Sequence, residues 1–463
     1  MMIYRALFIL SIFLFMGCGS EDGKESRDLN STGVETVEKV PREVTVYIHG
    51  YDKDGYKKRG VYGDTSTDMV IDNLVEFTDL PTMYNFDKEN FTNIITMTEY
   101  YGDEAPAYYI QQDIDDIEKV TKAHGGGIPR YATIVAKFIK HVMDESGADE
   151  VNIVSASMGS LVTRWLIEKD IEGLASSKKI KKWLSIEGVI RGNYVASNSI
   201  VMGLIDPFEK QYIDTKHMDY SWINKNLADA SHPNYKDIFM GFIGSTHDKD
   251  GYLDSLLTVN GQLQANDGVQ LLKDTKFIST PNHTPTYTNF YQDHLGIKKD
   301  RGAWAGAATF LSSKKHVKIT LLNAKVENLH ESIYFLNKRA EIVFESRVFS
   351  SKVYEKFGVE DAISERIVEG GALNMVKYSK KGENKFIGQT LFNDFVLDDE
   401  AELSLVIEGY ELDKFVIYGV REPSFESSKS SLGKVEIEIP LREGVYEVTG
   451  KDWYGKIEME FIH

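Results

Sequence analysis

The chain has 463 residues, more than one domain usually holds, and 42% of them are hydrophobic, enough to fill well-packed cores. Its formal net charge of −18 argues against nucleic acid as a partner, because binding nucleic acid requires basic patches. The single cysteine excludes an intramolecular disulfide.

The first residues have the layout of an export signal. Arg5 is positively charged, residues 6–16 are apolar apart from Ser11, and the sole cysteine, Cys18, follows. The apolar run is too short to span a bilayer comfortably. Its end resembles a bacterial lipobox, whose cysteine is lipidated; the alternative is an ordinary signal sequence with an incidental cysteine. We expect residues 1–18 to be a lipoprotein signal and the exported protein to be anchored to a bacterial membrane, periplasmic or at the cell surface.

Residues 19–43 are polar and poor in aromatic residues, which predicts a flexible tether. Residues 44–314 then alternate between strand-like and helical patterns. The expected strands are 44–48, 93–98, the run before residue 155, 183–186 and 238–243, and the expected helices are 67–77, 131–146, 161–168 and 303–311. This alternation predicts an α/β domain with a mainly parallel sheet flanked by helices.

One serine lies at a sharp turn between a strand and a helix. The segment Ser155-Ala156-Ser157-Met158-Gly159 follows an apolar run and precedes a helical stretch, the layout of the nucleophile elbow G-x-S-x-G. Small residues are needed there because the turn brings strand and helix close together. Ser155 stands in place of the first glycine. The alternative is a small-residue turn without function, but the flanking elements favour Ser157 as a nucleophile.

A serine nucleophile needs a base, and the base needs an acid that orients it. In folds with this elbow the acid and then the histidine follow the serine in the chain. The acid candidates near strand ends are Glu187, Asp254, Asp267 and Asp274. We favour Asp267, because its Asn-Asp-Gly turn holds a carboxylate at a loop tip above the sheet; the alternative is an ordinary turn aspartate.

Two histidines follow Asp267 within the α/β domain. His283 lies in a loop bounded by prolines, and His294 lies in the loop before the expected closing helix. A base on the loop just before the last helix meets the geometry of a triad, so we favour His294 over His283.

The oxyanion formed in acyl transfer needs fixed N–H donors. One is expected from the backbone of Met158, directly after the nucleophile. The second is expected from Tyr51, because His49-Gly50 allows a tight turn that presents the Tyr51 N–H. His49 precedes the nucleophile in the chain, so we expect it to stabilise this loop and not to act as the base.

Together these stretches resemble bacterial lipases and esterases of the α/β-hydrolase superfamily. The resemblance covers roughly residues 44–313 and rests on residues 47–51, the elbow and its helix, residues 266–269, and His294-Leu295. The resemblance is to a divergent member, because residues 187–192 replace a Gly-Thr-Pro-His-like stretch of the family and Ser155 replaces the first glycine of the elbow.

The resemblance implies an α/β-hydrolase fold and a triad of Ser157, Asp267 and His294, with an acyl ester or lipid as substrate and no cofactor. Some lipases of this kind bind calcium near the histidine, but two nearby carboxylates are a weak signal, so we expect no metal. Members also carry a lid over an apolar cleft. Residues 193–235 are either such a lid or an ordinary packed helix pair.

From Lys315 onward the pattern changes to alternation of apolar and polar residues. The expected strands are 317–326, 341–349, 402–407, 434–439, 445–448 and 456–462. They predict a separate C-terminal antiparallel β-sandwich over residues 315–463, for which we expect an accessory role.

Two functions are therefore compatible with the sequence. The first is a serine hydrolase, a lipase or esterase of the triacylglycerol lipase type, acting on acyl lipids through an acyl-enzyme. The alternative is a catalytically inactive surface lipoprotein with a hydrolase fold that acts in binding or adhesion. The sequence indicates no particular oligomeric state.

Overall fold

The structure is a computed structural model. It describes residues 42–462 except 53, 67–68, 84–86, 88, 90, 199–211, 246–256, 260–261, 265, 278–285, 291, 329–339, 361–363, 367–375, 379–380 and 413–428. The predicted lipidation site Cys18, the acid candidate Asp254 and the alternative base His283 therefore lie outside the described residues. Among the described helices, none combines the length and apolar character that a membrane span requires.

A six-stranded parallel sheet forms the centre of the α/β part, with the strand order β2-β1-β3-β4-β5-β8. The strands are β1 (Glu43–Ile48), β2 (Asn93–Met97), β3 (Glu150–Ala156), β4 (Ile180–Ile186), β5 (Phe239–Ser245) and β8 (Thr286–Phe290). β1 begins at Glu43, the last residue of the predicted tether. The strand order reverses between β1 and β3, and in open α/β sheets ligands bind at this point, beyond the carboxyl ends of the strands.

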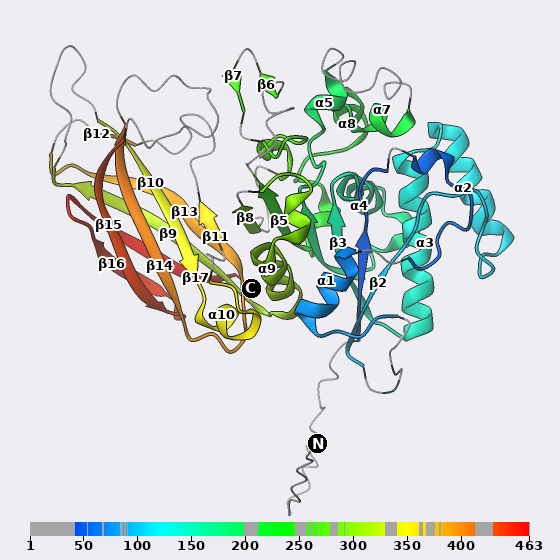
Figure 1. Ribbon diagram of the computed structural model, residues 1–463, viewed down its shortest axis with the longest axis horizontal. Helices are drawn as coiled ribbons and strands as arrows, with labels where there is room; N and C mark the ends of the chain where they lie inside the picture. Colours follow the sequence, from blue (N-terminus) through cyan, green and yellow to red (C-terminus); the bar gives the residue numbers. More distant parts are fainter. Residues whose placement is uncertain are drawn as a thin grey trace, which may run out of the picture. The chain divides into compact units, whose positions relative to one another are not determined.

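Helices cover both faces of this sheet (Figure 1). α3 (Ile128–Ser146) and α4 (Met158–Glu168) pack on one face, and α2 (Gln111–His124) lies outside α3. α1 (Met69–Thr78) and α9 (Arg301–Ser312) pack on the other face. This is the α/β-hydrolase fold, because a strand–serine–helix elbow lies in the centre of a parallel sheet covered by helices.

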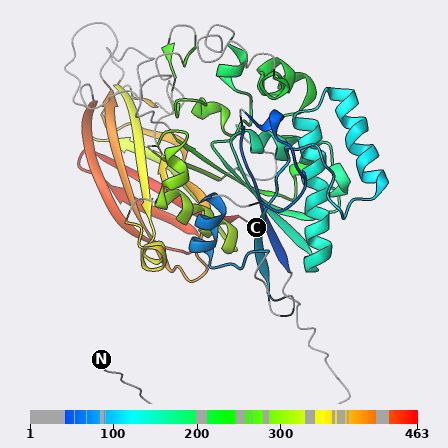
Figure 2. The same cartoon turned by 45° about the vertical axis from the view of Figure 1, so that its right-hand side comes forward.

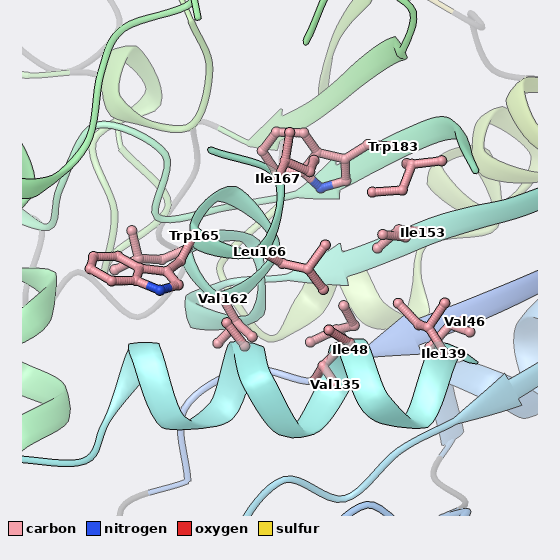
Figure 3. Packing of buried hydrophobic residues seen from close by; sticks show 14 of the residues in the cluster. Val46, Ile48, Val135, Ile139, Ile153, Val162, Trp165, Leu166, Ile167 and Trp183 are labelled. Atoms are coloured by element: carbon pink, nitrogen blue, oxygen red, sulfur yellow. The ribbon is translucent and has the colours of Figure 1, made fainter. Parts of the chain in front are cut away.

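Alternating residues of each central strand belong to the two cores. Val46 and Ile48 of β1 lie with Ile153 of β3 against Val135 and Ile139 of α3 (Figure 3). The residues between them, such as Tyr47 and Val154, point to the opposite core beneath α1 and α9. Both faces are therefore apolar, as a parallel sheet buried on both sides requires.

The segment predicted as a lid or packed helix pair contains α5 (Tyr194–Ser197), α7 (Ile213–Met218) and α8 (Tyr220–Asn226) in its described part. The Trp222 ring of α8 stacks on Trp165 of α4, with 5.3 Å between the ring centroids. The Ile128 N–H at the start of α3 donates to His217 Nδ1 of α7 at 3.2 Å. These contacts pack α7 and α8 against α3 and α4.

The remaining short elements of the α/β part lie in its loops. The short strands β6 (Thr258–Val259) and β7 (Gln262–Leu263) pair antiparallel, and 3-10 turns lie at Gly55–Lys57, Ile171–Gly173, Pro233–Tyr235, Leu272–Asp274 and Gly296–Lys299.

The C-terminal part consists of two antiparallel sheets, which confirms the predicted β-sandwich. One sheet has the order β13-β9-β17-β16, and the other has the order β11-β10-β14-β15 with β12 paired to β10. Residues such as Ile319, Phe344, Leu405 and Trp453 form the buried core of this part. Its elements are β9 (Lys315–Val326), β10 (Ala340–Phe349), α10 (Ser351–Phe357), β11 (Ser364–Arg366), β12 (Val376–Tyr378), β13 (Asn384–Val396), β14 (Glu402–Leu412), β15 (Lys429–Pro440), β16 (Gly444–Thr449) and β17 (Trp453–Ile462).

The sandwich shares a buried cluster with the α/β part. Val353 and Phe357 of α10, together with Phe395 and Leu397, pack in the same apolar core as α1 and α9. α9 lies beside the sandwich strands in both Figure 1 and Figure 2. Phe395 meets Phe310 of α9 edge to face, with 5.1 Å between the ring centroids.

A buried lysine joins β4 to the end of α9. The Lys182 ammonium donates to the carbonyl oxygens of Phe310, Leu311 and Ser313 at 2.6, 3.0 and 2.6 Å. The last carbonyls of a helix lack intrahelical donors and form the negative end of its dipole, so a cation there is stabilising. Burial lowers the pKa of Lys182 to about 8.

We expect Lys182→Met to lower the free energy of unfolding by about 2–4 kcal/mol, because three buried carbonyl oxygens lose their donor. Lys181→Met on the same strand is the matched control, since this ammonium is about half exposed and lies 3.6 Å from Glu150. An exposed pair of this kind contributes less than about 1 kcal/mol. Urea denaturation of both variants measures the difference, and equal effects would contradict the role given to Lys182.

Candidate active site

Ser157 lies on a strained turn between β3 and α4. Its backbone has φ 49° and ψ −123°, a conformation that L-residues rarely adopt. Its N–H donates to the Ile186 carbonyl at 3.0 Å, and its carbonyl accepts from the Val189 N–H at 3.0 Å. These bonds from the end of β4 and the loop after it hold the serine at the tip of the turn, as in a nucleophile elbow.

The elbow needs small residues because two backbones meet there. A Cβ at Gly159 would lie 2.4 Å from the carbonyl oxygens of both Ile48 and His49, so no larger residue fits. Ser155, which replaces the first glycine of the pattern, is accommodated by hydrogen bonds. Its hydroxyl accepts from the Trp183 indole N–H at 2.8 Å and lies 3.1 Å from Ser160 Oγ.

The three residues predicted as nucleophile, acid and base lie in contact. His294 Nε2 is 3.1 Å from Ser157 Oγ, and His294 Nδ1 is 2.7 Å from Asp267 Oδ2. The backbone N–H of His294 also donates to the Asp267 carbonyl at 2.9 Å, which fixes the two loops against each other. A hydroxyl, an imidazole and a carboxylate in this order can move a proton away from the serine.

Further hydrogen bonds orient the acid. Asp267 is buried, and its Oδ1 accepts from the N–H groups of Val269 and Gln270 at 2.8 and 2.6 Å. The Gln270 side chain donates to the Gly192 carbonyl at 2.7 Å and accepts from the Asn193 amide at 2.6 Å. The turn that was predicted from Asn266-Asp267-Gly268 is therefore tied to the segment after β4.

A second buried carboxyl lies against the same imidazole. On sequence grounds Glu187 is an acid candidate behind Asp267. It follows β4 with a positive φ of 47°, and its Oε2 lies 3.1 Å from His294 Nδ1. The Ser245 hydroxyl donates to its other oxygen, Oε1. The position of Glu187, at the end of the strand beside the elbow strand, was the only sequence signal for this contact.

The charges of Asp267, Glu187 and His294 shift the pKa values of these groups. Burial disfavours the charged imidazole, but the carboxylates of Asp267 and Glu187 outweigh it and raise the pKa of His294. Burial and the charge of Asp267 raise the pKa of Glu187. Glu187 therefore keeps its proton to a higher pH than an exposed glutamate does.

Glu187, Asp267 and His294 also offer three ligand-type atoms that lie within 4.8 Å of one another. Two ligand atoms of a tetrahedral zinc lie about 3.3 Å apart when the bonds are about 2.0 Å long. The separation of 2.7 Å between His294 Nδ1 and Asp267 Oδ2 is shorter and is typical of a hydrogen bond. The group therefore fits an acid–imidazole pair better than a metal centre.

The predicted oxyanion donors lie on two segments that border Ser157. Met158 is the first residue of α4, so its N–H has no intrahelical acceptor. A Cβ at Gly50 would lie 3.0 Å from Ser157 Cβ, so the loop that carries the Tyr51 N–H passes directly beside the serine.

Side chains of Tyr100 and Glu99 hold the loop that follows β1. The Tyr100 hydroxyl lies within hydrogen-bonding distance of the carbonyls of His49 and Gly50, at 2.7 and 2.9 Å, and its ring stacks on the His49 imidazole. His49 Nε2 lies 3.3 Å from Glu99 Oε1. Although burial opposes ionisation, the contact with His49 lowers the pKa of Glu99 to about 2. His49 thus faces away from the proton path and packs within the loop.

No family model matches the sequence, and no curated protein matches it. Among solved structures, the chain is similar to the lipase BlEst2 of Bacillus licheniformis in its mature form, at 14% identity over 57% of this chain and 90% of that chain, with a TM-score of 0.35. It is also similar to the phospholipase PlaB of Legionella pneumophila, at 9% identity over 89% of this chain and 91% of that chain, with a TM-score of 0.38.

We expect Gly159→Ala to destabilise the protein by several kcal/mol, because the new Cβ would overlap two backbone carbonyl oxygens. Gly306→Ala in α9 is the control, since nothing lies within 4 Å of the Cβ position there. Alanine in place of a helical glycine adds about 1 kcal/mol of stability. Thermal unfolding should therefore shift in opposite directions for the two variants. A shift in the same direction would mean that the elbow tolerates a side chain at residue 159.

Proposed function

We propose that this protein is a serine hydrolase that cleaves carboxylic esters through an acyl-enzyme. The observation that carries the proposal is the pair of contacts from His294, at 3.1 Å to Ser157 Oγ and at 2.7 Å to Asp267 Oδ2. His294 takes the serine proton as Ser157 Oγ attacks the ester carbonyl, and it then returns that proton to the leaving alcohol. Asp267 holds the imidazole in the required tautomer and stabilises its charged form.

The negative charge on the former carbonyl oxygen is met by the N–H groups of Met158 and Tyr51. The α4 N-terminus adds a favourable dipole at Met158. Losing one such donor typically costs about 100-fold to 1,000-fold in rate. Water then attacks the acyl-enzyme with His294 acting as base again, and the released acid restores the free serine.

We further propose acyl lipids as the substrates. The support is the sequence around Cys18, which resembles a lipobox, because a lipid-anchored enzyme would work at a membrane surface where such lipids are concentrated. The β-sandwich then has an accessory role in orienting the α/β part or in binding a substrate aggregate or partner. An inactive binding protein remains the alternative function, and it differs in its reaction with a serine-directed probe.

A fluorophosphonate probe should label the native protein, and Ser157→Ala should abolish the labelling. The same variant and His294→Ala should lower hydrolysis of a short p-nitrophenyl ester by on the order of 10⁴-fold or more, because the nucleophile or its base is gone. His283→Ala is the control and should keep its activity. Absence of labelling in the folded native protein would favour the binding function, and a damaging His283→Ala would refute His294 as the base.

For acyl lipids we expect kcat/KM to rise with acyl length from four to eight or more carbons. Each buried methylene contributes about 0.8 kcal/mol, so kcat/KM should rise at most about fourfold per methylene. Cys18→Ser, which prevents lipidation, should leave hydrolysis of soluble esters unchanged and should lower hydrolysis of esters in vesicles. Rates that stay flat or fall with chain length would exclude acyl lipids as the substrate class.

A further inference from the structure

The His294 imidazole faces two carboxyl groups where one would suffice to orient it. Its Nδ1 lies 2.7 Å from Asp267 Oδ2 and 3.1 Å from Glu187 Oε2. Both carboxyl side chains are almost completely buried, with 1% and 2% of their surface exposed. They come from different parts of the chain, one from the loop after β7 and the other from the end of β4.

The two carboxyl groups are held differently. Asp267 accepts two backbone N–H bonds on Oδ1, in addition to its contact with the imidazole. Glu187 accepts the Ser245 hydroxyl on Oε1, but among the described residues its Oε2 has only the nearby His294 and no aligned hydrogen-bond donor. The Nδ1 contact of His294 has hydrogen-bond geometry toward Asp267 and only ion-pair distance toward Glu187. Asp267 is therefore the hydrogen-bond acceptor of His294 Nδ1, and Glu187 lies next to it without accepting a hydrogen bond from Nδ1.

We propose that Glu187 is a positioning residue that acts through His294, as a second carboxyl partner of Nδ1 that shares the base with Asp267. This inference rests on the proposed hydrolase function. Glu187 has two effects in this role. It raises the proton affinity of the base, and it takes over as acceptor for Nδ1 when Asp267 cannot accept.

The first effect is electrostatic. The groups that face Glu187 are His294 from the loop before α9, Asp267 from its own loop, and Ser245 from β5. When Glu187 has lost its proton, its charge beside the imidazole favours the charged form and raises the pKa of His294. Because catalysis requires the neutral imidazole, the acid limb of the pH profile should lie above pH 6.5, the usual pKa of histidine. The apparent pKa belongs to the coupled groups together.

Glu187→Gln tests this effect, because it keeps the shape of the side chain and removes the charge that Glu187 carries after it has lost its proton. We expect the acid limb of kcat/KM against pH to move down by about one unit or more. Asp274→Asn is the matched control. Asp274 is also a buried carboxyl, but it accepts from the Tyr220 hydroxyl and forms no hydrogen bond or ion pair with His294. Its removal should leave the acid limb in place, and an equal shift in both variants would overturn the proposal.

The second effect predicts a non-additive pair of variants. If Glu187 replaces the lost acceptor, Asp267→Asn should lower kcat/KM by only about 10-fold to 100-fold, compared with about 10⁴-fold where a triad has a single acid. Asp267→Asn combined with Glu187→Gln should then show the full loss. A full loss in Asp267→Asn alone would overturn the second effect.

A measurement without turnover separates this inference from the proposed function. The pKa of His294 can be followed by NMR in Ser157→Ala, with and without Glu187→Gln, and it should fall by about one unit or more when the charge is removed. If the native protein hydrolyses no ester but this shift is seen, the hydrolase proposal fails and the contact with Glu187 stands. If the shift is absent, the role of Glu187 is refuted.

Ser245→Ala is a second variant, in case the glutamine is not tolerated in the folded protein. It removes the hydroxyl that stabilises the Glu187 carboxylate, so less of its charge reaches His294. The acid limb should move in the same direction by a smaller amount. An unchanged acid limb in this variant would count against the proposal.

Discussion

The arrangement of the site depends on one close contact between two backbone segments. These are the loop after β1 and the first turn of α4. Gly159 and Gly50 leave no space between this loop and the elbow. The contact is possible because β1 and β3 are parallel neighbours whose carboxyl ends meet at the point where the strand order reverses. The serine hydroxyl, the start of α4 and the loop amides are thereby brought together by the backbone, before any flexible side chain takes part. A site built this way is preorganised, which is what stabilising a developing charge requires.

The imidazole side of the site is held in another way, through side chains and a helix. His294 lies on the loop that leads into α9, and α9 is bound at its far end by Lys182 of β4. Its apolar face packs on residues from the sandwich, including Phe395. His294 is therefore positioned by a helix whose other contacts, with Lys182 and with Phe395, do not involve Ser157. This gives the C-terminal part a structural connection to the site, although its described residues form no hydrogen bond or ion pair with Ser157 or His294.

Local patterns predicted the parts of this protein that depend on neighbours in the sequence. The elbow, the Asn-Asp-Gly turn and the loop before α9 could each be recognised from a few residues, and so could most strands. β13 was missed because two register shifts, near residues 386–389 and 390–392, interrupt its alternation of apolar and polar residues. α2 was missed because it lies outside α3 with Ile117 as its one buried residue, so polar and charged residues dominate its sequence. The contact of Glu187 with His294 joins distant residues, and no local pattern could distinguish it from an ordinary strand end.

The shared apolar cluster beneath α1 and α9 also affects how the newly made chain reaches its folded state. Synthesis proceeds from the N-terminus, and domains generally fold as units as they emerge. Here Leu74 and Phe77 of α1 belong to a core that also contains Phe357, Phe395 and Leu397. One face of the α/β part therefore stays uncovered until the ribosome has translated most of the sandwich. During that interval the exposed apolar face is a site for aggregation or for chaperone binding. The last third of the chain therefore determines when this face is covered and aggregation and chaperone binding there end.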